Sequence, residues 1–343
     1  LLRRGNCLHL RHFVLGSAMK FLLSTFACLA ALLCWSSADD RPNFILFITD
    51  DISAEDLGCY GDPVAKTPHL DQMAAEGIRF TNAYLTISSC SPSRCSLITG
   101  RYPHNTGAPE LHTRLPEGHY LWPEALKKAG YHTALSGKHH MGDHADPAFP
   151  RISKGKGPGK EADWVPMLRD RPKDQPFFFW FASMDAHRDW QIDDTAPVYN
   201  PEEIKVPPYL IDGPLTRQDL ADYYHEVSRT DHFAGEIRKE LQRQGIEGDT
   251  YFLYLADNGR PFPRCKVRLY ESGIRSPLII FCPGRIAPGE TESLVSVNVD
   301  LGPTILQLAG LEPDERMQGV SLVPVLEDPS ATVRDFAFAE HNW

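Results

Sequence analysis

The sequence predicts an α/β fold in which a mostly parallel central sheet is flanked by helices. Apolar runs of strand length alternate along most of the chain with segments that carry helix caps or a helical apolar stripe, and this alternation is typical of parallel strands joined through helices. Several of the apolar runs are continuous, as in strands that are covered on both faces. No internal repeat and no convincing linker interrupts the pattern, so we expect one main domain.

The individual elements follow from local patterns. Continuous apolar runs predict strands at 43–49, 78–83, 131–136, 177–184, 251–256 and 278–282. Helices are indicated from Thr67-Pro68 to about residue 76, from 121 to 129 before Gly130, and from 303 to about 308. A long helix capped by Thr216 has an apolar stripe made of Leu220, Tyr224, Val227, Ala234, Ile237 and Leu241.

Charge restricts the class of partner. The 343 residues include 35 Lys and Arg against 45 Asp and Glu, a net charge of −10, and they contain no long basic run. Nucleic acid is therefore excluded as an expected partner. An anionic substrate is not excluded, because local cations are sufficient to bind one. Residues 154–160, with the sequence KGKGPGK, are expected to form a flexible, basic surface loop.

The first 38 residues are expected to consist of upstream sequence followed by a signal peptide. Met19 is the expected start, and it is followed by a lysine, an apolar run over 21–35 and small residues at 36–38. A membrane anchor is the alternative, but the run is short for a span. We expect an exported protein with no stable membrane insertion after signal removal, with 39–343 as its functional domain. The location would be periplasmic or extracellular in a bacterium, and lysosomal or secreted in a eukaryote.

Cysteine usage points to one reserved thiol. Three of the eight cysteines lie in the leader, and Cys59, Cys90, Cys95, Cys265 and Cys282 remain. An odd number in an exported protein suggests that one thiol serves a purpose other than a disulfide. Pairing among the other four cannot be assigned from the sequence.

Polar residues gather where the predicted strands end. Ligands of open α/β sheets bind beyond the carboxyl ends of the strands. Four of the apolar runs end in side chains capable of chemistry: Asp50-Asp51, Gly137-Lys138-His139-His140, Asp185-Ala186-His187 and Asp257-Asn258-Gly259. Each ending alone could be a turn or a helix cap. The four endings together predict a functional site on one rim of the sheet.

Two parts of this site can be assigned from residue chemistry. Asp50, Asp51, Asp257 and Asn258 form an all-oxygen set that suits Ca²⁺ best and Mg²⁺ second. Cys90 lies shortly before Pro92, which can begin a helix, so it would face the end of the helix that favours anions. A bare thiolate beside carboxylates is a poor nucleophile, and a modified cysteine makes better chemical sense.

The chain resembles the sulfatase family of the alkaline-phosphatase-like superfamily over about residues 41–326. The most specific match is Cys90-x-Pro92-Ser93-Arg94 with its continuation to Gly100, and further matches include Asp50-Asp51, Gly137-Lys138, Asp257-Asn258-Gly259 and Gly319-Val320-Ser321-Leu322. Within the family it is most similar to the heparan N-sulfatase (N-sulfoglucosamine sulfohydrolase) branch. That similarity rests on Ser88-Ser89 before Cys90, His139-His140, His187-Arg188 and Pro261-Phe262-Pro263.

The resemblance implies a role for each site residue. A formylglycine-generating maturation enzyme would oxidise Cys90 to formylglycine, which would bind Ca²⁺ together with the four oxygen-bearing residues. Arg94 and Lys138 would stabilise the oxyanion of the nucleophile, His140 would orient it and remove its proton, and His187 would protonate the leaving group. Lys266 would hold a sulfate oxygen, with Arg264 and Arg268 as competitors. His139 could be mistaken for His140, and His112 is a candidate for the pocket.

The implied activity is that of a sulfatase, a sulfuric ester or sulfamate hydrolase, in the breakdown of glycosaminoglycans or other sulfated polysaccharides. The substrate would be N-sulfoglucosamine at a heparan-type chain end, or an O-sulfated sugar. The alternatives are a phosphate- or phosphonate-ester hydrolase of the same superfamily and an inactive sugar-binding relative. A homodimer is compatible with either class of activity.

Three departures from the family pattern qualify the resemblance. Cys95 places a second thiol near Cys90, and the region between Gly142 and Trp164 is short, which predicts an open cleft. The chain stops at Trp343, where the family usually continues into an antiparallel C-terminal subdomain. We therefore expect a truncated catalytic domain from which this subdomain is largely absent.

Overall fold

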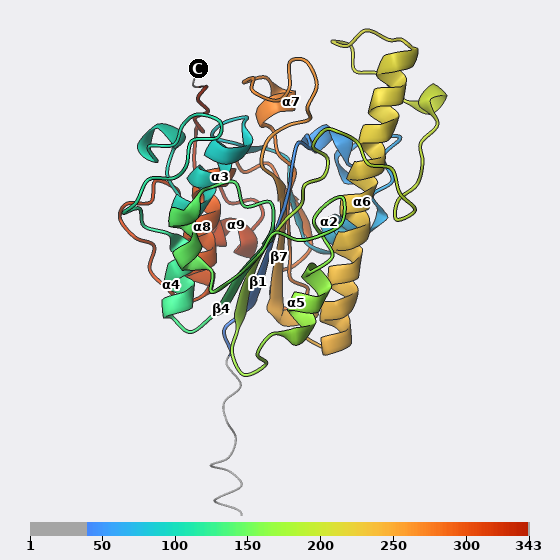
Figure 1. The fold of residues 1–343 in the computed structure, drawn as a ribbon. Helices are drawn as coiled ribbons and strands as arrows, with labels where there is room; N and C mark the ends of the chain where they lie inside the picture. Colours follow the sequence, from blue (N-terminus) through green and yellow to red (C-terminus); the bar gives the residue numbers. More distant parts are fainter. Residues whose placement is uncertain (1–39, 342–343) are drawn as a thin grey trace, which may run out of the picture. The chain divides into compact units, whose positions relative to one another are not determined.

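A mostly parallel eight-stranded sheet forms the centre of the computed structural model, which describes residues 40–341 (Figure 1). The strand order is β5-β4-β6-β1-β7-β8-β2-β9. Strands β5, β4, β6, β1 and β7 are parallel neighbours, β8 is antiparallel to both β7 and β2, and β2 is parallel to β9. The predicted fold class is confirmed. The predicted leader, with Met19 and three cysteines, lies outside the described residues.

The strands of the main sheet are β1 (Asn43–Thr49), β2 (Ile78–Phe80), β4 (His132–Gly137), β5 (Arg151–Ser153), β6 (Phe177–Ala182), β7 (Thr250–Ala256), β8 (Leu278–Phe281) and β9 (Gly289–Thr291). A separate pair consists of β3 (Ala83–Tyr84) and β10 (Val295–Ser296). The α-helices are α2 (Pro68–Glu76), α3 (Cys90–Thr99), α4 (Trp122–Lys128), α5 (Trp164–Asp170), α6 (Pro214–Gln244), α7 (Glu271–Ile274), α8 (Val297–Leu308) and α9 (Val323–Glu327). Short 3₁₀ helices lie at Ala54–Asp56, Gly58–Tyr60, Pro103–Asn105, Asp143–Ala148, Pro201–Glu203 and Glu247–Asp249.

Two helical layers cover the two faces of the sheet, as Figure 1 shows. In β1, Phe44, Leu46 and Ile48 point into a core shared with α3, α4, α8 and α9. Ile45 and Phe47 point to the other face, into a core shared with α2, α5 and α6. Burial on both faces explains why this strand reads as a continuous apolar run.

Two predicted helix starts were wrong because each helix begins earlier than predicted and includes a proline in its first turn. Helix α6 begins at Pro214, with Gly213 as its N-cap, two residues before the predicted cap Thr216. Helix α3 begins at Cys90 rather than Pro92. Proline fits the first turn of a helix because the N–H groups there have no intrahelical partner.

Two further predictions were wrong because tertiary contacts override the local pattern. Helix α8 begins at Val297, six residues before Pro303, which lies inside it. The carbonyl of Val299, four residues before this proline, faces Gly319, where a Cβ atom would lie only 1.9 Å from it. The predicted strand 78–83 is divided into β2 and β3, since Thr81 and Asn82 turn toward β9 and bond Thr291 and Glu292.

The five cysteines in the described part of the chain are all free. The prediction that four of these cysteines pair and leave one thiol over is therefore not supported. Cys95, the neighbour that could have interfered with Cys90, is fully buried in the apolar core. Among residues 40–341, no helix has both the length and the apolar character needed to cross a membrane.

Candidate active site

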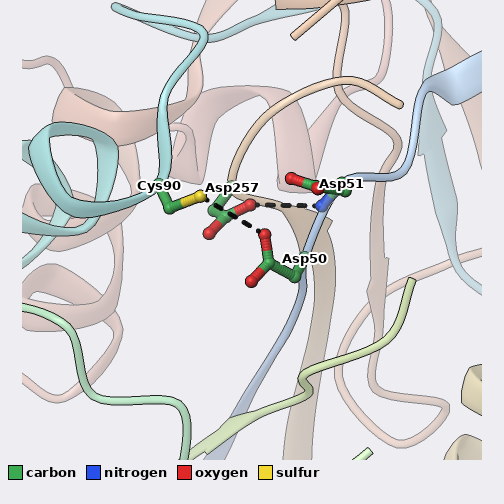
Figure 2. Close-up of side chains that lie close together, drawn as sticks. All are labelled: Asp50, Asp51, Cys90 and Asp257. Atoms are coloured by element: carbon green, nitrogen blue, oxygen red, sulfur yellow. Dashed lines mark hydrogen bonds between the residues drawn. The ribbon is translucent and has the colours of Figure 1, made fainter. Parts of the chain in front are cut away.

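Adjacent parallel strands place four oxygen-bearing side chains at one point of the sheet rim. Thr49, the last residue of β1, is level with Ala256, the last residue of β7. The residues that follow, Asp50-Asp51 and Asp257-Asn258, are at most 1% exposed. Oxygens of the three carboxylates and the sulfur of Cys90 all lie within 4.8 Å of one another (Figure 2).

Cys90 reaches this cluster from the first residue of helix α3. It is 2% exposed, and its Sγ lies 3.5 Å from Oδ1 of Asp50. Ser89 before it is extended, and Gly100 ends the helix in a left-handed conformation with φ of 66°. Burial, followed by the charges of Asp257 and Asp51, raises the pKa of the Cys90 thiol to about 12. An unmodified Cys90 is therefore a neutral thiol near pH 7 and not a thiolate.

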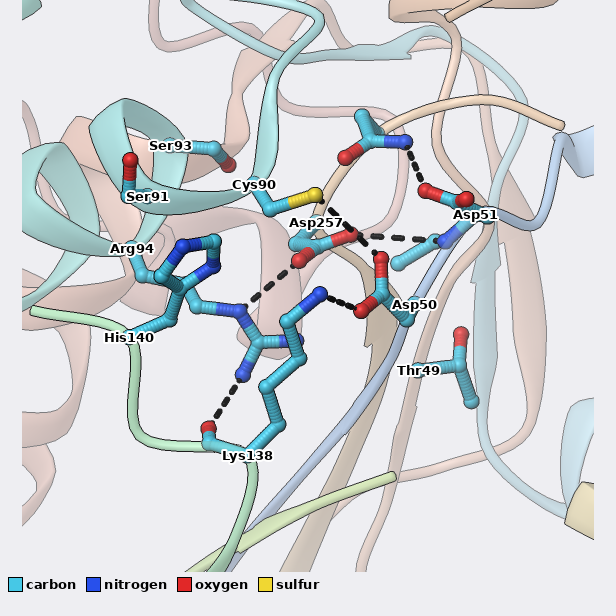
Figure 3. Close-up of polar contacts among 12 residues, drawn as sticks. Thr49, Asp50, Asp51, Cys90, Ser91, Ser93, Arg94, Lys138, His140 and Asp257 are labelled. Atoms are coloured by element: carbon cyan, nitrogen blue, oxygen red, sulfur yellow. Dashed lines mark hydrogen bonds and ion pairs between the residues drawn. The ribbon is translucent and has the colours of Figure 1, made fainter. Parts of the chain in front are cut away.

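Three cations face the three carboxylates, and Figure 3 shows two of them, Arg94 and Lys138. Arg94, one turn along α3 and fully buried, donates from Nε to Asp257 at 2.8 Å and from Nη1 to the carbonyl of Lys138 at 2.7 Å. Lys138 is ion-paired with Asp50. Lys266 donates to both carboxylate oxygens of Asp51, at 2.6 and 2.8 Å. This balance of charge allows three carboxylates to be buried together.

Lys138 is aimed into the site by the end of β4. At Gly137 the backbone has φ of 101°, and a Cβ atom there would lie 1.9 Å from the carbonyl oxygen of Ala182. Only glycine fits this approach, and the next N–H, that of Lys138, donates to the same carbonyl at 2.9 Å. Burial lowers the pKa of Lys138 to about 8.

Of the two consecutive histidines, His140 is the one that faces the site. Its Nε2 lies 2.9 Å from Nδ1 of His112, whose own backbone N–H donates to Ser91 Oγ at 2.7 Å. Burial, then the nearby Lys138 and Arg94, lowers the pKa of His140 to about 3, so the ring is neutral. Its Nδ1 is buried and has no hydrogen-bond partner among residues 40–341. His139 turns away, with Nε2 at 3.1 Å from Asp146.

His187 comes to the same rim from the segment after β6. That segment is joined to β1 because Asp50 N–H donates to the carbonyl of Asp185 at 2.8 Å and Ala186 N–H donates to the carbonyl of Asp50 at 2.6 Å. Burial lowers the pKa of His187, Asp51 opposes this change, and Lys138 and Lys266 add to it.

Lys266, the cation predicted for the substrate side, reaches the carboxylate cluster through Asp51. The guanidinium of Arg264 lies 4.2 Å from the ring centre of Tyr270 and so turns to the surface. Burial disfavours the charge of Lys266, but Asp51 and the other acidic groups of the cluster together outweigh burial and raise the pKa of Lys266.

The donor set fits a hard metal ion. All the protein oxygens come from carboxylates and one amide, which are the ligands that Ca²⁺ and Mg²⁺ accept. Nδ2 of Asn258 donates to Asp51 at 2.6 Å and to the carbonyl of Gly259 at 2.9 Å. Oδ1 of Asn258 is buried and has no hydrogen-bond partner within the described part of the chain. A cation among these oxygens would satisfy this atom.

This arrangement can hold a metal ion beside the side chain of Cys90, as a hydrolase that acts on an anionic group requires. Residues 42–151 and 162–311 match the family described as Sulfatase, and the chain belongs to the sulfatase family. Members of this class hydrolyse sulfate esters or sulfamates, so the predicted enzyme class is confirmed.

Two relatives show how much of the chain is shared. N-sulphoglucosamine sulphohydrolase of Homo sapiens is 30% identical over 371 residues, which cover 92% of this chain and 72% of the relative. N-acetylgalactosamine-6-sulfatase of Rattus norvegicus is 30% identical over 388 residues, covering 90% of this chain and 70% of the relative. Among solved structures, one described as a complex with its substrate D-glucosamine-2-N,6-O-disulfate has a TM-score of 0.72 at 24% identity. It covers 87% of this chain and 82% of the solved chain, and this similarity concerns the fold.

Proposed function

We propose that this chain is an exported sulfohydrolase that removes sulfate from a sulfated sugar, using formylglycine formed from Cys90 and a bound Ca²⁺. The observation that carries the proposal is the convergence of three buried carboxylates and Cys90 within 4.8 Å at the start of helix α3. Residues 39–343 would be the catalytic domain, exported by the leader before it.

Asp50, Asp51, Asp257 and Asn258 would hold the metal. A divalent cation bound there supplies Lewis acidity, which lowers the pKa of a hydroxyl that it contacts. Ca²⁺ is favoured over Mg²⁺ because the ends of strands β1 and β7 give an irregular set of oxygens, which Ca²⁺ tolerates better.

Cys90 would be the site of the nucleophile. Formylglycine supplies an aldehyde, and its hydrated form carries a hydroxyl that can attack sulfur. The raised pKa of the unmodified thiol, about 12, argues against direct attack by the cysteine. The partner implied by this chemistry is a formylglycine-generating maturation enzyme.

The surrounding side chains would stabilise charge and move protons. Arg94 and Lys138 are buried donors that contact Asp257 and Asp50 beside Cys90, and preorganised donors in a dry site stabilise developing negative charge. His140 is neutral, and its buried Nδ1 has no partner among the described residues. That nitrogen can therefore accept a proton from the hydroxyl group.

The substrate side would be formed by His187 and Lys266. Burial lowers the pKa of His187 and the charge of Asp51 opposes this change; His187 would give a proton to the leaving oxygen or nitrogen. Lys266 would hold a sulfate oxygen as a point charge. The substrate we favour is N-sulfoglucosamine at the end of a heparan-type chain, because His187-Arg188 and Pro261-Phe262-Pro263 resemble the N-sulfatase branch. An O-sulfated amino sugar is the second choice, since relatives of both kinds are equally similar over the whole chain.

A paired substrate panel tests this function. Purified, matured protein is expected to turn over an aryl sulfate faster than the matching aryl phosphate, and a Cys90→Ala variant should lose this activity. Faster turnover of the phosphate would contradict the proposal, as would full sulfatase activity in the Cys90→Ala variant. Comparison of an N-sulfated with a 6-O-sulfated glucosamine then identifies the bond that is cleaved.

A further inference from the structure

A basic loop, residues 151–160, runs along the rim that carries the active site. Strand β5 is parallel to β4, and its last residue, Ser153, is level with Ser136. The loop thus leaves the sheet beside Gly137 and Lys138. Its far end reaches the segment after β6, where the carbonyl of Gly159 accepts hydrogen bonds from Met184 N–H at 3.0 Å and Ser183 Oγ at 3.3 Å. The loop therefore spans the interval between Lys138 and the segment that carries His187.

The cations of the basic loop are not neutralised by the protein. Among residues 40–341, no ion pair joins the side chains of Arg151, Lys154, Lys156 or Lys160 to an acidic group. The acidic residues next in sequence turn inward: Glu161 is 8% exposed, and Asp163 bonds Ser153. Elsewhere on the surface, cations are commonly paired, as in Arg188–Asp219, Arg217–Asp212 and Lys239–Glu236.

Hydrogen bonds within the loop support its backbone, although its glycines predicted a flexible segment. Gly155 N–H donates to Ser153 Oγ at 3.1 Å, Lys160 N–H to the carbonyl of Gly157 at 3.3 Å, and Ala162 N–H to the carbonyl of Lys156 at 3.1 Å. A Cβ atom on Gly155 would lie 2.0 Å from the carbonyl oxygen of Lys160. Cations on a preorganised backbone lose less entropy when an anionic ligand binds.

We propose that the basic loop is a second binding site, which holds anionic groups of a sulfated polysaccharide beyond the sugar that is hydrolysed. This inference rests on the proposed function. The chain as a whole carries a net charge of −10 and would repel a polyanion at long range, so an unpaired cationic segment on the active-site rim is the feature that such a chain would contact. The ligand class is a sulfated oligosaccharide several sugars long.

Binding in the absence of turnover tests the loop separately from catalysis. The full chain carrying Cys90→Ala is titrated with a heparin-derived octasaccharide, with the desulfated octasaccharide and with an oligonucleotide of equal charge. Adding Lys154→Gln, Lys156→Gln and Lys160→Gln should raise the Kd for the sulfated chain by about tenfold, since each exposed ionic contact contributes up to about 1 kcal/mol. The matched control, Lys128→Gln with Lys239→Gln, removes two exposed lysines on other elements and should leave the Kd unchanged. Melting temperatures show that each variant is folded.

Three results would overturn this inference. They are an unchanged Kd in the triple variant, an equal loss in the control, and equally tight binding of the oligonucleotide. In the matured enzyme, the triple variant should lose at least tenfold more kcat/KM on the octasaccharide than on a small aryl sulfate. Equal losses on the two substrates would also contradict the loop's role. Failure of the wild-type enzyme to hydrolyse any sulfate would instead refute the proposed function.

Discussion

Arg229 links the long helix α6 to the segment that carries His187, and its removal is expected to affect both stability and catalysis. The side chain is fully buried, and its Nε and Nη2 each donate to Asp185 at 2.8 Å. Nη2 also lies 3.0 Å from Glu226. The carbonyl of Asp185 in turn accepts from Asp50 N–H, and the N–H of the next residue, Ala186, donates to the carbonyl of Asp50. Helix α6 thereby fixes the backbone on which Asp50 and His187 are placed.

Replacing Arg229 with methionine leaves two carboxylates buried without their cation. Asp185 and Glu226 are each 2% exposed, and breaking a buried ion pair costs about 3–5 kcal/mol. At roughly 2–4 °C per kcal/mol, the Tm should fall by roughly 6–20 °C. The lower half of that range is expected, because burial and the charge of Asp185 already raise the pKa of Glu226 to about 8. Glu226 can therefore remain protonated.

Thermal unfolding followed by circular dichroism measures this effect. Adding Asp185→Asn to Arg229→Met removes one buried charge together with its partner and should recover part of the lost Tm. Arg316→Met is the matched control, since Arg316 is an exposed side chain paired with Asp314, and it should melt with the wild type. A Tm for Arg229→Met within error of the wild type would refute the reasoning. So would a double variant less stable than Arg229→Met alone. Because His187 loses its support, the kcat of Arg229→Met should fall more than its KM rises.

Three further predictions concern the pH dependence of stability, the histidine that contacts His140, and the metal. Burial raises the pKa of Asp231 to about 7, so the folded state binds its proton more tightly than the unfolded chain, and its contribution to stability is lost as the pH rises from about 4 to 7. Asp231→Asn should therefore reduce the difference in Tm between pH 4.5 and pH 7.5, and an unchanged difference would contradict this. His112→Ala removes the hydrogen bond to His140 and should lower kcat about tenfold with little change in KM. A purely structural loss would instead lower the Tm and leave the turnover of the folded fraction intact. Treatment with a chelator should lower the Tm and abolish turnover, both restored better by Ca²⁺ than by Mg²⁺, and a Tm unaffected by the chelator would show that no resident cation is bound.

The polar residues at the strand ends could be predicted because the apolar run that forms each strand lies directly before them in the sequence. An apolar run such as 43–49 forms a strand buried on both faces, and the next residues, Asp50 and Asp51, must emerge at its carboxyl end. Parallel neighbours bring such ends together, and the structure places the Asp257 ending beside them. His140 was separable from His139 only through the resemblance, since the two residues are adjacent and chemically identical.

The supports behind the site could not be predicted, because nothing in the local sequence marks them. Arg229 lies two positions past Val227, off the apolar stripe of helix α6, where an arginine normally faces water. Its burial depends on the segment after β6 folding over the helix. Pro303 was predicted to start a helix, but it lies inside helix α8. The turn of α8 before this proline packs against the backbone of Gly319, which is distant in sequence and so could not be anticipated.

The most direct test of the central claim is the mass of the peptide that contains Cys90, taken from active protein isolated from its native host. The account predicts that residue 90 carries the aldehyde of formylglycine in the active molecules, because the buried thiol, with a pKa of about 12, is a poor nucleophile beside three carboxylates. An unmodified Cys90 thiol in protein that hydrolyses sulfate at full rate would contradict it.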